Sequence, residues 1–147
     1  VNITTELLQK IKPHQIFAAG DLADPHGTHK VCLDILLASL QQLKKVSPGE
    51  KASWLKDCWL WLYKGAWQEW NIEEIEMAIP MSPDQVLQKR YGIFIHQSQK
   101  DMVPFQGSDS REFWQRAEER NENTANLYAQ LGLTHYAAME AFVRWKY

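Results

Sequence analysis

The chain has 147 residues, of which 45% are hydrophobic and 23% are charged, and its formal net charge is −2 at pH 7. This length and composition predict one ordinary globular domain over residues 1–147. Because charges of both signs are mixed and no basic block stands out, no nucleic-acid partner is indicated. No apolar stretch approaches the roughly 20 residues that span a bilayer, so no membrane partner is predicted either.

The cysteines indicate the cellular location of the protein, and the first residues indicate whether the chain is part of a longer polypeptide. Cys32 and Cys58 both fall in apolar segments, which is typical of buried thiols in a reducing compartment and favours a cytoplasmic location. The chain opens with an amphipathic helical pattern and not with a signal peptide. It also lacks an initiator Met, which indicates a piece of a longer polypeptide.

The first half of the chain alternates helices with apolar strands. Residues 4–12 are predicted to form a helix, and 16–19 a short buried strand. A second helix is predicted over about 28–46, where apolar residues recur at helical spacing. Residues 58–63, Cys-Trp-Leu-Trp-Leu-Tyr, give the strongest strand signal in the chain, because they are apolar and aromatic without a helical period.

The second half is predicted to be mainly helical. A strand over 75–79 precedes three helices, over 82–99, 109–131 and 134–145, of which the first two begin with capping-box patterns. Gly132 is expected to end the second of these helices. This order predicts the α/β class: a partial Rossmann-like three-layer domain with helices on both faces of a short, mainly parallel sheet, ending in a run of helices. Since sheets average about five to six strands and only about three are predicted, we expect part of the fold upstream of residue 1.

The loop after the first predicted strand holds four potential metal or acid–base groups. Asp21, Asp24, His26 and His29 fall within nine residues, where open α/β sheets bind their ligands. The two histidines lie three apart at a helix start, on one side of its first turn, and neutral imidazole is a good zinc ligand. The alternative is a helix start decorated with polar caps and surface histidines, and spacing alone favours neither.

Two motifs resemble those of the PIG-L/LmbE-type de-N-acetylases. Asp24-Pro25-His26-Gly27-Thr28-His29 is similar to that family's second metal motif, which usually runs His-Pro-Asp-His. Lys89, followed by His96-Gln97-Ser98-Gln99, resembles the family's Lys and His-x-Ser-Gln. Residues 105–121 are also similar to the carboxyl-terminal region of long bacterial proteins, in which a glucosamine-6-phosphate deaminase (isomerase) domain precedes a PIG-L-like domain.

The resemblance implies a zinc hydrolase that removes the acyl group of an N-acetylated amino sugar or amino-sugar phosphate. It implies that His29 is a zinc ligand, and that His26, with Asp24 beside it, is the catalytic acid or oxyanion stabiliser. The downstream motif, which comprises Lys89 and the His96-Gln97-Ser98-Gln99 stretch, would bind the substrate through His96, Gln99 and Lys89. The alternatives are a polar helix cap for His96 and a solvated helix charge for Lys89.

The chain departs from the family's pattern in two ways. It contains no His-Pro-Asp-Asp, the family's first metal motif, which would lie upstream of residue 1 with the first strand. Since a catalytic zinc needs about three protein ligands, we expect Zn²⁺ in the full-length domain, but neither zinc nor activity in this chain. Gly27 and Thr28 also replace the usual Pro and Asp.

A non-catalytic role is the alternative function. The region would then regulate the attached amino-terminal deaminase domain or mediate its oligomerisation, which would give a homo-oligomer. The charged face of the helix predicted over 109–131 is expected to be a solvated, ion-paired surface, or else to dock that domain.

The tryptophans divide into core and pocket candidates. Either Trp59 or Trp61 is expected in the core, since alternate residues of a strand face opposite sides. Trp67 and Trp70 are the candidates for a pocket wall on which a sugar ring could stack.

Overall fold

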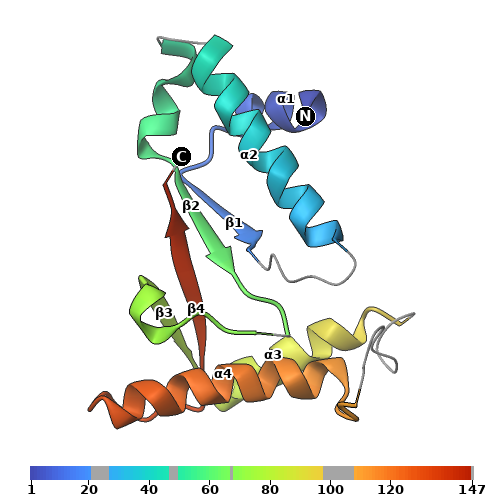
Figure 1. Ribbon diagram of the computed structural model, residues 1–147, viewed down its shortest axis with the longest axis vertical. Helices are drawn as coiled ribbons and strands as arrows, with labels where there is room; N and C mark the ends of the chain where they lie inside the picture. The colour runs from blue at the N-terminus through green and yellow to red at the C-terminus, as the bar shows by residue number, and fades with distance from the viewer. Residues whose placement is uncertain (21–26, 47–49, 67, 98–107, 147) are drawn as a thin grey trace. The chain divides into compact units, whose positions relative to one another are not determined.

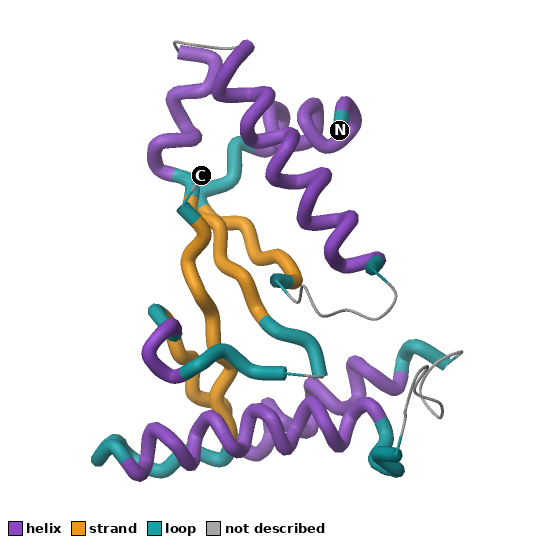
Figure 2. The backbone as a smooth tube through the Cα atoms, in the orientation of Figure 1, coloured by secondary structure: helices purple, strands orange, loops and turns teal. Residues whose placement is uncertain are grey.

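The computed structural model describes residues 1–20, 27–46, 50–66, 68–97 and 108–146 (Figure 1). The chain divides into two compact units, one formed by residues 1–63 with 144–147 and the other by residues 64–143. Each unit has its own helices and its own pair of strands. Figure 2 shows the helices in purple and the strands in orange.

The unit of residues 1–63 and 144–147 begins with helix α1 (Asn2–Ile11), strand β1 (Gln15–Ala19) and helix α2 (Thr28–Val46). The 3₁₀ helix η1 (Glu50–Asp57) leads into strand β2 (Trp59–Tyr63). The two strands are parallel, with Ile16 opposite Leu60 and Ala18 opposite Leu62. Helices α1 and α2 lie side by side, and α2 also contacts β1 (Figure 1).

The core of this unit is built from α2 and the centre of β2. Leu40 and Leu60 are fully buried, and Leu62 and Trp61 are nearly so. A strand buried on both faces is typical of parallel pairing in α/β proteins. The expectation that one of two tryptophans packs in the core is confirmed for Trp61, whereas Trp59 is exposed and has the Arg144 guanidinium 3.7 Å from its ring centroid.

The unit of residues 64–143 contains the 3₁₀ helix η2 (Ile72–Glu74), strand β3 (Met77–Met81), and helices α3 (Pro83–Phe94) and α4 (Phe113–Gln130). Strand β4 (Ala138–Trp145) belongs to it up to Val143. Strands β3 and β4 are antiparallel, with Ala78 opposite Ala141. Helices α3 and α4 contact each other along this unit (Figure 1).

The mixed α/β class predicted from the sequence is confirmed. The helix predicted over 134–145 is wrong, because this segment forms β4, so the described residues contain four strands instead of about three, and the second pair is antiparallel. Ala, Met and Glu favour a helix locally, but Ala138, Met139, Ala141 and Phe142 are buried where the segment pairs with β3. Tertiary pairing therefore overrides local propensity here.

The helix ends follow local signals more closely. Ser82 caps α3 and Gly132, with a φ of 95°, follows α4 as the predicted helix-ending glycine. Within the described residues, no helix is long and apolar enough to cross a membrane.

Candidate functional site

Three of the six residues predicted to form the catalytic, metal and substrate site are described. His29 is exposed in the first turn of α2, whereas Asp24, His26 and Gln99 lie outside the described residues. Among the residues that the structure describes, no group of three or more His, Cys, Asp or Glu side chains could hold a metal ion. The metal role of His29 therefore stays a prediction.

His96 follows the last turn of α3. Its side chain is exposed, and its backbone N–H donates to the Ile93 carbonyl oxygen at 3.0 Å. This position suits a polar helix end, where a histidine complements the helix dipole. It leaves the imidazole accessible, so a substrate contact stays a prediction as well.

Lys89 makes an internal ion pair. Its ammonium donates to Asn121 Oδ1 at 2.7 Å and forms an ion pair with Glu140. The side chain is only 30% exposed, so Lys89 links α3 to α4 and to β4. Lys89 is therefore not the freely solvated helix charge that was the alternative to a substrate contact.

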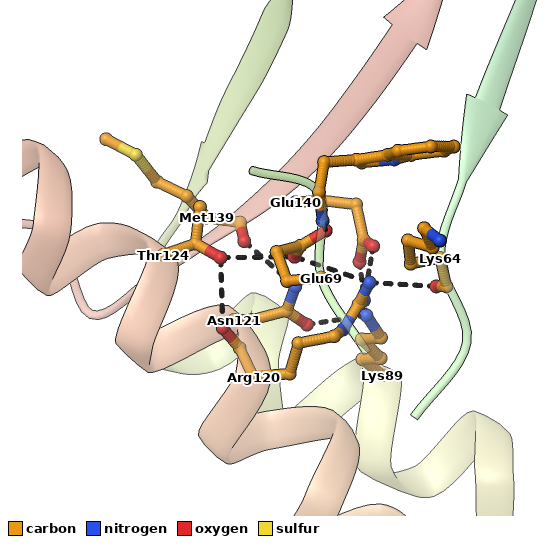
Figure 3. Close-up of polar contacts among 9 residues, drawn as sticks. Lys64, Glu69, Lys89, Arg120, Asn121, Thr124, Met139 and Glu140 are labelled. Carbon is orange, nitrogen blue, oxygen red and sulfur yellow. Dashed lines mark hydrogen bonds and ion pairs between the residues drawn. The ribbon is translucent and has the colours of Figure 1, made fainter. Parts of the chain in front are cut away.

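Arg120, on α4, is at the centre of a polar cluster (Figure 3). Its Nη1 donates to the Lys64 carbonyl oxygen at 2.8 Å and lies 3.4 Å from Glu69 Oε2, while Nη2 donates to Glu140 Oε1 at 2.5 Å. The Arg120 side chain is 7% exposed. A buried charge is costly unless it is paired, and two carboxylates here compensate one guanidinium.

Two uncharged side chains of α4 complete this Arg120 cluster. The amide of Asn121, which is buried, donates through Nδ2 to the Met139 carbonyl oxygen at 2.8 Å. The Thr124 hydroxyl lies 3.1 Å from Glu69 Oε2 and 3.0 Å from the Arg120 carbonyl oxygen. The cluster thus ties α4 to β4 and to the segment that follows β2, all within residues 64–143 (Figure 3).

The pKa values of the two carboxyl groups in the cluster, Glu69 and Glu140, are shifted in opposite directions. Burial raises the pKa of Glu69 above its ordinary value, and this outweighs the lowering by Arg120, the Trp70 backbone N–H and Thr124. Burial also acts to raise the pKa of Glu140, but Arg120 and Lys89 together hold the pKa of that carboxyl below its ordinary value. Both effects are expected, since burial disfavours a charge and an opposite charge favours it.

A cavity of about 310 Å³ adjoins this cluster, and it is lined by residues of α4, by Arg111 and by residues 66 and 68–70. Its lining includes charged, amide and aromatic side chains, among them Gln68, Glu69, Trp70, Arg116, Arg120 and Asn123. The prediction that Trp70 is part of a pocket wall is confirmed. Trp67, the other candidate, lies outside the described residues.

The charged face of α4 differs from its prediction at two positions. Arg116 and Arg120 are buried, with 6% and 9% of their surface exposed, so a fully solvated face is wrong. The prediction of ion pairs is confirmed, since Arg116 pairs with Asp109. The missed signal is the stripe of small and polar residues at helical spacing, which includes Ala117, Asn121, Thr124 and Ala125, all of them buried.

Comparison with known proteins finds a close relative. The chain is 58% identical over 145 residues to a glucosamine-6-phosphate deaminase-like protein of Bacteroides thetaiotaomicron. No protein-family model matches the chain. The alignment covers 99% of this chain but only 21% of the relative, so the chain spans about one fifth of the length of the curated relative that it matches.

Proposed function

We propose that this chain is the carboxyl-terminal region of a larger protein of amino-sugar metabolism, in which it follows a glucosamine-6-phosphate deaminase (isomerase) domain. The observation that carries the proposal is the 58% identity, which extends over 99% of the chain. Because the match covers only 21% of the relative, we assign deamination to residues outside this chain. An amino sugar or its phosphate would be the substrate of the whole protein.

Within that protein, we propose that the region contributes to a PIG-L-like zinc-dependent de-N-acetylase. His29 would be the zinc ligand, His26 and Asp24 its catalytic neighbours, and His96 and Gln99 substrate contacts. Support comes from the position of the Asp-Pro-His-Gly-Thr-His motif, which follows β1 in the sequence and ends in the first turn of α2, and from the accessible His96 after the end of α3. Bound zinc would supply a Lewis acid and a water activated for amide hydrolysis.

The residues of this chain would act by holding groups in place. His29 is in the first turn of α2, a helix of 19 residues, where its backbone carbonyl oxygen faces along the helix as an acceptor for the following turn. Lys89 contacts a substrate only if its ion pair with Glu140 opens. We therefore expect Lys89 to position α3 and not to bind the sugar directly.

An assay of acetate release by the longer protein that contains this chain tests the proposal. With zinc supplied, we expect this protein to release acetate from N-acetylglucosamine or its 6-phosphate. His29→Ala should lower its zinc content, because a metal ligand is lost, and should lower acetate release by at least about 100-fold. His14→Ala is the matched control, since His14 is also an exposed histidine of the same unit, next to β1. Absence of acetate release from the parent protein, or unchanged release in His29→Ala, would contradict the proposal.

A further inference from the structure

The cavity beside α4 is not used by the proposed zinc chemistry. Its volume of about 310 Å³ is at the lower end of the range for small-molecule sites. All of its lining residues named above belong to the unit of residues 64–143. The cavity is therefore a property of this unit by itself, and it is large enough for one small molecule.

The arginines that line the cavity are already paired with carboxylates. Every arginine that lines it contacts at least one carboxylate within 4 Å, and the neighbouring Lys89 does so as well. Four cations face four carboxylates in these pairs, namely Lys89, Arg111, Arg116 and Arg120 with Glu69, Asp109, Glu119 and Glu140. Since the formal charges of these eight side chains balance, the lining arginines offer no unmatched charge to an ionic ligand.

Two amide side chains at the cavity remain open for hydrogen bonds. Gln68 and Asn123 both line it and are exposed, and neither side chain bonds to another part of the chain that the structure describes. Each amide offers two donor hydrogens and one acceptor oxygen. These amides are satisfied best by a ligand whose groups both donate and accept hydrogen bonds, such as a ring that carries several hydroxyl groups.

Trp70 supplies the apolar part of the wall. Its indole lines the cavity and is partly exposed, and the Lys64 ammonium, 4.3 Å from its ring centroid, helps to hold it in place. Small-molecule sites combine such aromatic surface with a few well-placed polar groups. An aromatic face beside two free amides matches a sugar, which has C–H groups on its ring faces and hydroxyls at its rim.

We propose that this cavity binds a neutral sugar ring, with Trp70 against the ring and Gln68 and Asn123 on its hydroxyls. A phosphorylated sugar is expected to bind more weakly, because each lining arginine is already engaged by a carboxylate. The inference does not depend on zinc or on the role of His29.

NMR titration of the ¹⁵N-labelled 147-residue chain tests this directly. Glucose and N-acetylglucosamine are added in turn, and the side-chain NH₂ signals of Gln68 and Asn123 are followed, each assigned by its absence in the alanine variant. We expect saturable shifts of these signals with a neutral sugar, and weaker binding of glucose 6-phosphate. Saturable shifts confined to other residues, tighter binding of the phosphate, or no saturable binding of either neutral sugar would overturn the proposal.

Two single variants and a control locate the site. Gln68→Ala and Asn123→Ala should each weaken neutral-sugar binding by roughly fivefold, as expected for the loss of one hydrogen bond between uncharged groups. Gln130→Ala, an exposed position near the end of α4 and outside the lining, should leave the affinity unchanged. Because all three positions are exposed, the dispersed spectrum of the folded chain is retained, and equal affinity in all three variants would overturn the assignment.

Discussion

At the residue scale, Glu69 and Glu140 lie beside the same guanidinium, yet their pKa values move in opposite directions. Arg120 Nη2 is 2.5 Å from Glu140 Oε1, whereas Arg120 Nη1 is 3.4 Å from Glu69 Oε2. Glu140 also has Lys89 as a second cation. The pKa of Glu69 is therefore raised by burial, while the pKa of Glu140 is lowered because two positive charges outweigh the same effect.

Neutral substitutions at these two positions should differ in their effect on folding. Glu140→Gln should lower the free energy of unfolding at pH 7 by about 2 kcal/mol, because Arg120 and Lys89 lose their closest carboxylate. Glu69→Gln should change it by no more than about 1 kcal/mol, because folding already disfavours the charged form of that side chain. Urea unfolding, followed by circular dichroism, measures both.

The two glutamates are each other's control, since both substitutions replace a partly buried carboxylate by an amide of the same shape. Equal destabilisation by the two variants would mean that Arg120 depends on both carboxylates alike. That result would contradict the assignment of Glu140 as its main partner.

At the element scale, α3 begins where its sequence predicts. The Ser82 hydroxyl accepts a hydrogen bond from the Gln85 backbone N–H at 3.3 Å, and the Gln85 side chain accepts one from the Ser82 N–H at 2.9 Å. Pro83 occupies the first helical position. These contacts lie within four residues, so no distant partner is needed to form them.

Removal of this cap should cost about 1 kcal/mol. Ser82→Ala leaves a backbone N–H at the start of α3 without its side-chain acceptor, and the loss is measured as a shift of the urea midpoint. Ser82→Asp is the control, because a carboxylate accepts the same hydrogen bond and also complements the helix dipole. A midpoint lowered equally by both substitutions would show that the cap does not stabilise the helix.

At the scale of the whole molecule, stability should depend on pH through these groups. A carboxyl with a lowered folded pKa stabilises the protein above its unfolded pKa, and this contribution is lost as the pH falls through the folded value. Glu140 is such a group, whereas Glu69, with a raised folded pKa, stabilises below its unfolded pKa and loses this contribution as the pH rises. The ordinary value for both is 4.5.

Unfolding measured from pH 3 to pH 7 by circular dichroism separates the two contributions. Glu140→Gln should flatten the loss of stability below about pH 4.5, and Glu69→Gln should flatten the decline above it. Asp109→Asn is a useful comparison, since hydrogen bonds from Arg111 lower the pKa of Asp109 on the protein surface. An acid profile that Glu140→Gln leaves unaltered would contradict the role of its ion pairs.

Several parts of this protein follow from the sequence by itself. The α/β class, the strand predicted over residues 58–63 and observed as β2, and the start of α3 are predicted correctly, because apolar patterns and capping contacts are local. The placement of Trp70 on a pocket wall is predicted as well. The zinc motif is a sequence observation too, and its role stays a prediction.

Other features were decided only by the tertiary structure. Residues 138–145 have helix-favouring composition, yet they form β4 because β3 offers hydrogen-bonding partners and burial. Arg116 and Arg120 look like surface charges, yet both are buried. The partners of Arg120 include the Lys64 carbonyl oxygen and the Glu69 carboxylate, which lie more than 50 positions before it in the sequence. A sequence shows which side chains are charged, but only folding brings a distant carboxylate or carbonyl oxygen close enough to make a buried charge stable.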